Sequence, residues 1–421
     1  MEDKKFFFDR GAAKIGLGDY RGSIADYDKA IELDPIYAKA YNNRGLAKGT
    51  LGDLAGSIAD YDKAIELDPI FAKAHYNRGL AKKDMGDKDG ACLDWSKAIE
   101  LDPTYAAAYN NRGIIKNDLG DHTGAIADYN KSIELDPTFA EVYYNRGFAK
   151  DDLGDHKGAI ADYSKVIVLD PIYAAAYNNR GLAKGTLGDL AGAIADFSKT
   201  IELDPTYAEA YYNRCVAKYG LGDYRGAIAD CSKAIELNPT YAAAYNNRGD
   251  AKYNLGDHMG SIADYNKVIE LDPTYAEAYF NRGSVKIDLG DYIGAIADFS
   301  KAIDLDPTFA KAYNNRGTAK YNLGDHTGAI ADFSKVIELN PTHVNAYNSR
   351  GILKNDLGDM AGSIADFSKV IELDPTFAKA YFNRGTAKYN LGDKDGACLD
   401  WSKAGELGLG DAYDLIKEYC N

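Results

Sequence analysis

Apolar side chains recur along this chain with a helical period, and the whole pattern repeats every 34 residues. The eleven prolines, from Pro35 to Pro375, are each separated by 34 residues, so no insertion or deletion interrupts the array. A fixed period of this length is typical of a protein that stacks small supersecondary units, each contacting its neighbours. We number positions 1 to 34 within a repeat, with proline at position 32; repeat 1 then covers residues 4–37 and repeat 12 covers residues 378–411.

Each repeat is predicted to form two helices. Apolar or aromatic residues fall at positions 1, 4, 8 to 10 and 14, and again at 20, 21, 24, 27, 28 and 30, which is a helical spacing and not the alternation of a strand. Gly at position 15 and Asp at position 16 are typical of a helix end followed by an N-cap. Asp-Pro closes the second helix in most repeats, since the residue before proline avoids helical angles. Helices joined by so short a turn pack antiparallel, so the expected fold is all-α.

Three charged positions are the same in all twelve repeats: Arg at 7, Lys at 11 and Asp at 23. In an antiparallel pair, positions 7 and 11 lie opposite positions 20 to 27. We therefore expect Arg10 and Lys14 to pair with Asp26, and their equivalents to do so in every repeat. A basic stripe for an anionic ligand is the alternative. Each repeat carries about −1 net charge, which accounts for most of the chain's −15. Such an acidic array argues against a nucleic-acid partner, which needs a basic surface.

Small residues are expected to let the two helices of a repeat approach closely. Position 8 is glycine in eleven of twelve repeats, and position 20 is always Ala or Ser. In repeat 7, Cys215 replaces that glycine and Cys231 replaces the aromatic residue of position 24. We predict that these two side chains are neighbours whose volumes compensate; a disulfide between them is the alternative. The five cysteines show no CxxC motif and no even spacing, which does not indicate a disulfide framework.

The repeated pattern resembles the tetratricopeptide repeat family. It combines an aromatic residue at position 4, Gly at 8, Ala at 20, an aromatic residue at 24, Ala at 27 and Pro at 32 with a period of 34. The resemblance implies a right-handed superhelical solenoid of antiparallel helix pairs, with the first helix of each repeat on the concave face. Twelve repeats are expected within residues 1–411, followed by a C-terminal capping helix at residues 412–421. The chain departs from the family pattern at positions 7 and 11, where Arg and Lys replace the usual Leu and Tyr.

Position 6 is the candidate binding position, because the family architecture places it on the concave face. A ladder of carboxamides can pair with the backbone of an extended peptide, and similar asparagine ladders in the family bind peptides. Aromatic residues at position 5 would add stacking surface. The predicted peptide-binding residues are Asn43, Asn77, Asn111, Asn145, Asn179, Asn213, Asn247, Asn281, Asn315, Asn383, Tyr76, Tyr144 and Tyr212. The alternative is that these asparagines bond to their own neighbours and stabilise the repeat junctions.

No motif in the sequence indicates catalysis, so we expect no enzyme activity, no cofactor and no metal site. No 18-residue apolar stretch is present, so membrane insertion is not expected. The N-terminal residues MEDKKFFFDR show no signal peptide, which favours a cytoplasmic location. An extracellular location would follow if a signal had been removed or if the protein formed fibres.

The expected function is a non-enzymatic scaffold for protein–protein interaction, which binds an extended peptide or protein on its concave face. The alternative is a structural subunit whose copies join end to end into a filament. That alternative is motivated by Phe6, Phe7 and Phe8, which lie on the first helix with no preceding repeat to cover them.

Overall fold

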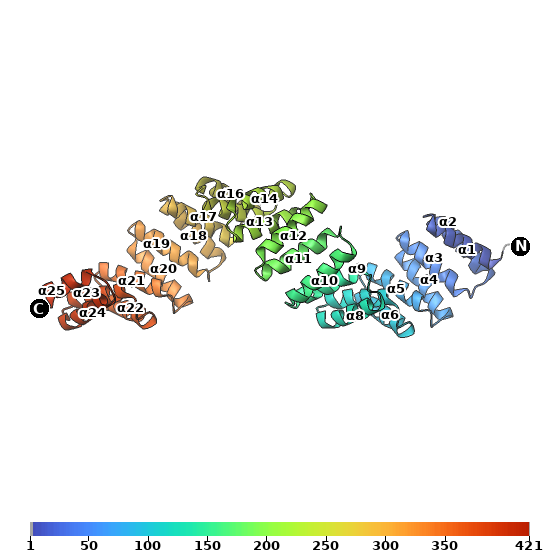
Figure 1. Cartoon of the computed structure of the whole chain (residues 1–421), viewed down its shortest axis with the longest axis horizontal. Coiled ribbons are helices and arrows are strands. Elements are labelled where there is room, and N and C mark those ends of the chain that lie inside the picture. The colour runs from blue at the N-terminus through green and yellow to red at the C-terminus, as the bar shows by residue number, and fades with distance from the viewer. Residues whose placement is uncertain (1–2, 421) are drawn as a thin grey trace. The chain divides into compact units, whose positions relative to one another are not determined.

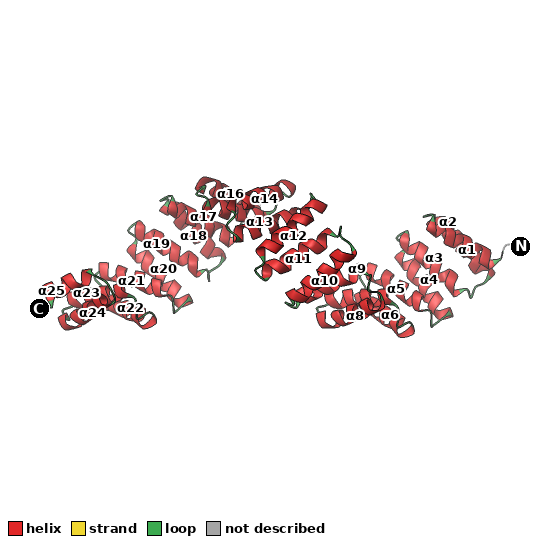
Figure 2. Ribbon diagram, viewed as in Figure 1, coloured by secondary structure: helices red, strands yellow, loops and turns green. Residues whose placement is uncertain are grey.

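The structure is a computed structural model that describes residues 3–420. These residues form helices joined by short turns, with no strand among them (Figure 2). We call the first helix of each repeat helix A. In chain order, the helices A are α1 (Lys4–Gly16), α3 (Ala38–Thr50), α5 (Ala72–Asp84), α7 (Ala106–Asp118), α9 (Ala140–Asp152), α11 (Ala174–Thr186), α13 (Ala208–Gly220), α15 (Ala242–Asn254), α17 (Ala276–Asp288), α19 (Ala310–Asn322), α21 (Val344–Asp356) and α23 (Ala378–Asn390).

We call the second helix of each repeat helix B. In chain order, the helices B are α2 (Tyr20–Leu33), α4 (Leu54–Leu67), α6 (Lys88–Leu101), α8 (His122–Leu135), α10 (His156–Leu169), α12 (Leu190–Leu203), α14 (Tyr224–Leu237), α16 (His258–Leu271), α18 (Tyr292–Leu305), α20 (His326–Leu339), α22 (Met360–Leu373) and α24 (Lys394–Glu406). A further helix, α25 (Asp411–Tyr419), follows the last repeat.

The chain divides into two compact units, Met1–Asn213 and Arg214–Asn421, and each is a stack of helix pairs. Within a unit, each helix A packs against the following helix B, which packs in turn against helix A of the next repeat (Figure 1). Consecutive helices A also touch, for example α3 and α5 in the first unit and α15 and α17 in the second. The prediction of an all-α solenoid of antiparallel helix pairs is therefore confirmed.

The Gly-Asp pair sets the turn between the two helices of a repeat. In repeat 2, Gly52 has a φ of 88°, a conformation that residues with a Cβ rarely adopt. Asp53 then caps α4 by accepting a hydrogen bond from the Gly56 amide at 2.9 Å. At the end of a helix B, Asp102 adopts an extended conformation before Pro103, so the chain leaves α6 there.

The glycine at position 8 lets the two helices approach because it faces the aromatic ring of position 24. A Cβ on Gly45 would lie 2.9 Å from Cε1 of Tyr61, closer than real side chains pack. Position 24 is an aromatic residue in every repeat except repeat 7, each of these rings is buried, and two of them are the indoles of Trp95 and Trp401. Position 24, more than position 20, is therefore the partner that requires glycine at position 8.

The predicted ladder of Arg, Lys and Asp is present in all twelve repeats. In repeat 2, Arg44 Nη2 and Lys48 Nζ lie 2.6 and 2.8 Å from the two carboxylate oxygens of the buried Asp60. Equivalent pairs form from repeat 1 to repeat 12. Each buried carboxylate thus has two cationic partners within its own repeat. The Arg and Lys side chains at positions 7 and 11 therefore form ion pairs within the protein, as expected, and do not form a free basic stripe.

The described residues form two disulfides, which corrects the expectation drawn from the cysteine spacing. Cys215 and Cys231 are bonded, with Cα atoms 5.5 Å apart. They are neighbours as predicted, and the disulfide alternative is the one the structure shows. Cys398 is bonded to Cys420 and so ties α24 to the segment after α25. The spacing was uninformative because each bond joins residues 16 or 22 positions apart in sequence that meet only after the chain has folded back.

The two ends of the described chain are covered by local contacts. Phe7 and Phe8 pack on the cluster around Tyr27, while Phe6 is 42% exposed and lies beneath the guanidinium of Arg10. At the other end, α25 packs against α24. Leu415 and Ile416 of α25 join the cluster around Trp401, and the Tyr419 ring centroid lies 6.2 Å from that of the indole. This helix therefore covers apolar surface that the last repeat would otherwise expose.

Candidate functional site

The asparagines at position 6 bond to position 5 of the preceding repeat. Asn77 Nδ2 donates to Asn42 Oδ1 at 3.0 Å, and Asn111 Nδ2 donates to the Tyr76 hydroxyl at 3.0 Å. The same bond is made by Asn145, Asn179, Asn213 and Asn281. Asn77 and Asn213 are buried, whereas the other predicted asparagines are half-buried. The junction role, one of the two alternatives for position 6, is thus present in the structure.

The remaining predicted asparagines lie at the same place on their helices. Asn43 and Asn315 each accept a hydrogen bond from the neighbouring asparagine at position 5, at 3.0 and 3.3 Å. Asn247 and Asn383 are half-buried. Direct contact between these amides and a peptide stays a prediction.

The aromatic residues at position 5 pack within their own repeat. The Tyr76 ring centroid lies 4.6 Å from that of Tyr105, and the Tyr144 centroid lies 5.1 Å from that of Tyr173. Burial raises the pKa of the Tyr76 and Tyr144 phenols, although hydrogen bonds from the position 6 amides offset part of that effect. Tyr212 is half-buried like the other two, so each ring offers only part of its surface to a ligand.

The guanidinium at position 7 also crosses the junction, which the sequence analysis did not anticipate. Arg44 Nη1 donates to Asp28 Oδ1 of the preceding repeat at 2.6 Å, while Nε and Nη2 hold Asp60. In later repeats the acceptor at position 25 is a serine or asparagine, such as Ser96 or Asn130. The sequence does contain an indication of this contact, because every residue at position 25 has a side-chain oxygen that can accept a hydrogen bond.

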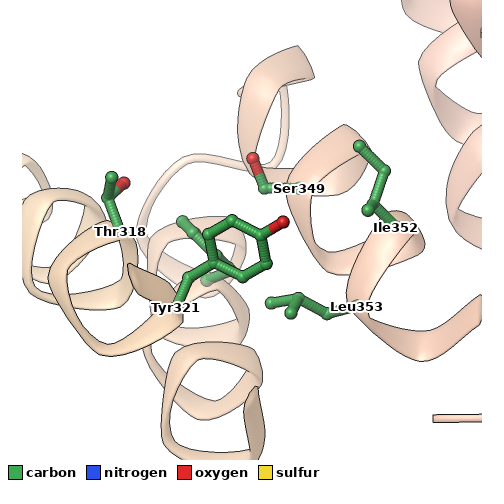
Figure 3. Close-up of a pocket in the computed structure, with 6 residues that line it drawn as sticks. Thr318, Tyr321, Ser349, Ile352 and Leu353 are labelled. Atoms are coloured by element: carbon green, nitrogen blue, oxygen red, sulfur yellow. The ribbon is translucent and has the colours of Figure 1, made fainter. Parts of the chain in front are cut away.

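Pockets lie between consecutive helices A. The pocket in Figure 3 lies between α19 and α21 and has a volume of about 140 Å³. Figure 3 shows the Tyr321 ring between Thr318 and the facing Ser349 and Leu353. Tyr321 is 44% exposed, so its ring forms a wall that a ligand can reach.

Two further pockets use the same repeat positions. One of about 210 Å³ lies between α3 and α5, and one of about 460 Å³ lies between α15 and α17. In all three pockets, positions 9 and 12 of one helix A face positions 6, 9 and 10 of the next. We call positions 6, 9, 12 and 13 of helices A the helix-A surface. Asn77 and Asn281, which were predicted from position 6, line these pockets.

Positions 9 and 12 are the functional candidates that the sequence analysis missed. Position 9 holds Leu46, Phe148 and Leu182, which are 38%, 46% and 39% exposed. Positions 9 and 12 vary between repeats among apolar, aromatic, hydroxyl and charged residues, whereas positions 7, 11 and 23 are the same in every repeat. This internal variation was visible in the sequence, and it marks side chains that the fold does not require.

The described residues include no group of three His, Cys, Asp or Glu side chains that could hold a metal ion. Within residues 3–420, no helix combines the length and the apolar character needed to cross a membrane. Two histidines at position 17 form hydrogen bonds through Nδ1 to side chains of their own repeat. His122 bonds to the side chain of Asn117, and His156 bonds to that of Asp151.

Comparison with known proteins found matches to family models and to solved structures. The structure of MamA is 32% identical and covers 39% of this chain and 96% of that chain, with a TM-score of 0.37. The structure of YrrB, described as a TPR protein with an unusual peptide-binding site, is 25% identical and covers 44% and 97%, with a TM-score of 0.42. The C-terminal part of a TPR repeat-containing protein from Cytophaga hutchinsonii is 24% identical and covers 56% and 97%, with a TM-score of 0.49. No curated protein matches the chain.

The family models match along most of the sequence. One model, described as TPR repeat, matches residues 11–52, 50–86, 113–150, 152–188, 186–222, 249–288, 283–324 and 353–392. Others, described as tetratricopeptide repeat, match residues 72–105, 95–127, 208–241, 231–263 and 310–343. Together with the helix pairs of the structure, these matches show that the chain belongs to the tetratricopeptide repeat family.

Proposed function

We propose that this protein is a scaffold that binds an extended peptide or protein segment across its helix-A surface. The family fold supports protein–protein interaction in general, and its members are typically non-enzymatic scaffolds. Fold alone does not select a binding face, so the choice of the helix-A surface rests on its side chains.

The observation that carries this proposal is that pockets and exposed apolar side chains use the same position of helices A. Position 9 lines all three pockets, among them the one that contains Leu46, and the equivalent side chains of repeats 5 and 6, Phe148 and Leu182, are exposed. Apolar side chains that line clefts with polar groups at their edges are typical of ligand sites. The asparagines at position 6 lie beside these side chains, where they can add hydrogen bonds to a bound backbone.

A displayed library of random peptides, selected against the full-length protein, tests the proposal. The affinity of the selected peptides is then measured by fluorescence anisotropy for a variant that carries both Phe148→Asp and Leu182→Asp. We expect this variant to bind those selected peptides that contact the first unit at least ten-fold more weakly, because it replaces exposed apolar side chains of the helix-A surface by carboxylates.

The matched control is Val168→Glu. Val168 is 71% exposed on α10, between α9 and α11 in sequence, and other repeats have glutamate or aspartate at its position. This control should bind like the unsubstituted protein. Selection of no peptide above background, or unchanged affinity for the double variant, would overturn the proposal.

End-to-end assembly of copies is a weaker candidate. Phe6 is exposed, but Arg10 covers its ring and Phe7 and Phe8 pack inward. At the other end α25 covers α24. Light scattering at high protein concentration tests this alternative, and filaments or a mass that grows with concentration would support it.

A further inference from the structure

The largest of the three helix-A pockets carries a carboxylate with no cationic partner. It lies between α15 and α17 in the second unit, and its volume is about 460 Å³. The lining residues that matter here are Tyr219, Asp250, Tyr253, Tyr265, Phe280 and Asn281. No lysine, arginine or histidine lines it among the residues that the structure describes.

Asp250 breaks the repeat pattern. It stands at position 9, where no other repeat has an acidic residue. The residues at the same position are Ala12, Leu46, Leu80, Ile114, Phe148, Leu182, Val216, Ser284, Thr318, Ile352 and Thr386. The architecture of the repeat therefore does not require a carboxylate there.

Neutral donors hold the Asp250 carboxylate in place. The Tyr265 hydroxyl donates to Oδ1 at 2.6 Å, Asn246 Nδ2 donates to Oδ2 at 3.2 Å, and Asn281 Nδ2 donates to Oδ1 at 3.3 Å. The ion pairs among the described residues include none with Asp250, and Lys252 on the same helix is paired with Asp264 at 2.7 Å. The carboxylate is thus oriented, but its charge is not balanced by the protein.

Two other carboxylates act on residues that line the pocket. Glu277 acts electrostatically on Asp250, and burial together with that repulsion raises the pKa of the Asp250 carboxyl. Asp288 accepts a hydrogen bond from the Tyr253 hydroxyl at 2.6 Å. A cation entering this pocket would meet the Asp250 carboxylate and would displace no lysine, arginine or histidine of the lining.

Aromatic rings complete the pocket. The Tyr219 hydroxyl accepts a hydrogen bond from Asn254 Nδ2 at 3.1 Å, and the Tyr253 hydroxyl donates one to Asp288. These hydrogen bonds to the hydroxyl groups orient both rings. Phe280 packs against Phe309 with ring centroids 4.9 Å apart. Ring faces attract cations and also accommodate an aliphatic stem.

From this geometry we propose that the pocket around Asp250 receives a lysine or arginine side chain of the bound peptide. The positive head pairs with the Asp250 carboxylate, and the aliphatic stem lies against the rings of Tyr219, Tyr253 and Phe280. This inference rests on the proposed peptide-binding function and adds a basic residue to the peptide's requirements.

Peptides selected on the full-length protein test the inference. In each peptide, every lysine is replaced in turn by norleucine and every arginine by citrulline, which keeps the stem but removes the positive charge. One such replacement should weaken binding about ten-fold or more for the unsubstituted protein. The same replacement should have little further effect on the Asp250→Asn variant, since that variant has already lost the pairing charge. Whether lysine or arginine fills the pocket follows from which replacement matters.

Asp304→Asn is the matched control, because it removes one negative charge from an exposed position of α18. It should leave the effect of the replacement intact. This inference would be overturned if the selected peptides that bind the second unit need no basic residue, or if they bind Asp250→Asn as tightly as the unsubstituted protein. Either result would leave the scaffold function standing. Selection of no peptide at all would overturn both. If Asp250→Asn melts early, the peptide replacements measured on the unsubstituted protein still decide whether a basic side chain is required.

Discussion

Arg44 holds Asp60 with two parallel hydrogen bonds, Nε to Oδ2 at 2.9 Å and Nη2 to Oδ1 at 2.6 Å. The carboxylate is buried, so its removal leaves the Arg44 and Lys48 charges without their partner. We expect Asp60→Asn to lower the free energy of unfolding by about 3 kcal/mol. Denaturant unfolding followed by circular dichroism measures the change.

Asp62→Asn is the control for this substitution. Asp62 pairs with Arg78 across a junction, but its side chain is 56% exposed. Exposed pairs contribute about 1 kcal/mol or less. Equal losses for Asp60→Asn and Asp62→Asn would contradict the account of the buried ladder.

Two glycines of α11 allow the effect of close helix packing on stability to be measured apart from the effect of helix propensity. A Cβ on Gly181 would lie 2.7 Å from Cε1 of Phe197, whereas the nearest atom to a Cβ on Gly185 is Ala193 Cβ at 3.9 Å. Gly181→Ala should therefore destabilise the protein by about 1–3 kcal/mol. Gly185→Ala should be neutral or stabilise it by up to about 1 kcal/mol, because alanine favours a helix more than glycine does. The midpoints of denaturant unfolding compare the two, and a loss of stability from Gly185→Ala would argue against this account.

The sequence predicted the contacts that every repeat shares and missed those made by variable positions. The bonds from Arg44 and Lys48 to Asp60 were predictable because all three residues recur in each repeat. The bond from Arg44 to Asp28 was missed, because position 25 holds Asp, Asn or Ser and only the side-chain oxygen is common to them.

The difference between uniform and variable positions also explains which residues of the candidate site were predicted and which were missed. Asn77 and its equivalents were predicted because the family architecture places position 6 on the concave face, with a junction role as the alternative, and the structure uses their amides to join repeats. Uniform positions in a repeat array serve the contacts that every repeat must make. The pockets are walled by positions that vary, such as those of Tyr321 and Asp250, and a pattern of repeats alone does not tell how these side chains meet.

Asp250 should reduce stability at neutral pH. Burial raises the pKa of its carboxyl above the ordinary value of 3.8, so the folded chain binds this proton more tightly than the unfolded chain does. Its contribution to stability is therefore largest at low pH and is lost as pH rises through the folded pKa. Asp250→Asn should raise the free energy of unfolding at pH 7, and the gain should shrink as pH falls toward 4. Denaturant titrations at several pH values check this, and a gain that does not depend on pH would contradict it.

The disulfide between Cys398 and Cys420 should hold α25 on the last repeat. It closes a segment with a sequence separation of 22 residues, for which chain entropy predicts about 3 kcal/mol of stabilisation. Cys420→Ser should make α25 sensitive to limited proteolysis and shift the fluorescence of Trp401 to longer wavelength, because Leu415 and Ile416 pack around that ring. Cys92→Ser is the control, since Cys92 occupies the same repeat position as Cys398 and is free. Equal protease resistance of α25 in both variants would count against a role for the crosslink.

The most direct test of the helix-A surface is photocrosslinking of a selected peptide to the full-length protein. A benzophenone amino acid replaces Phe148 in one sample and Val168 in another; both side chains are exposed, but the first lies on α9 and the second on α10. For peptides that bind the first unit, the account predicts a covalent adduct at position 148 and none at position 168. An adduct at position 168 alone, or equal yields at both, would show that the peptide does not lie along helices A.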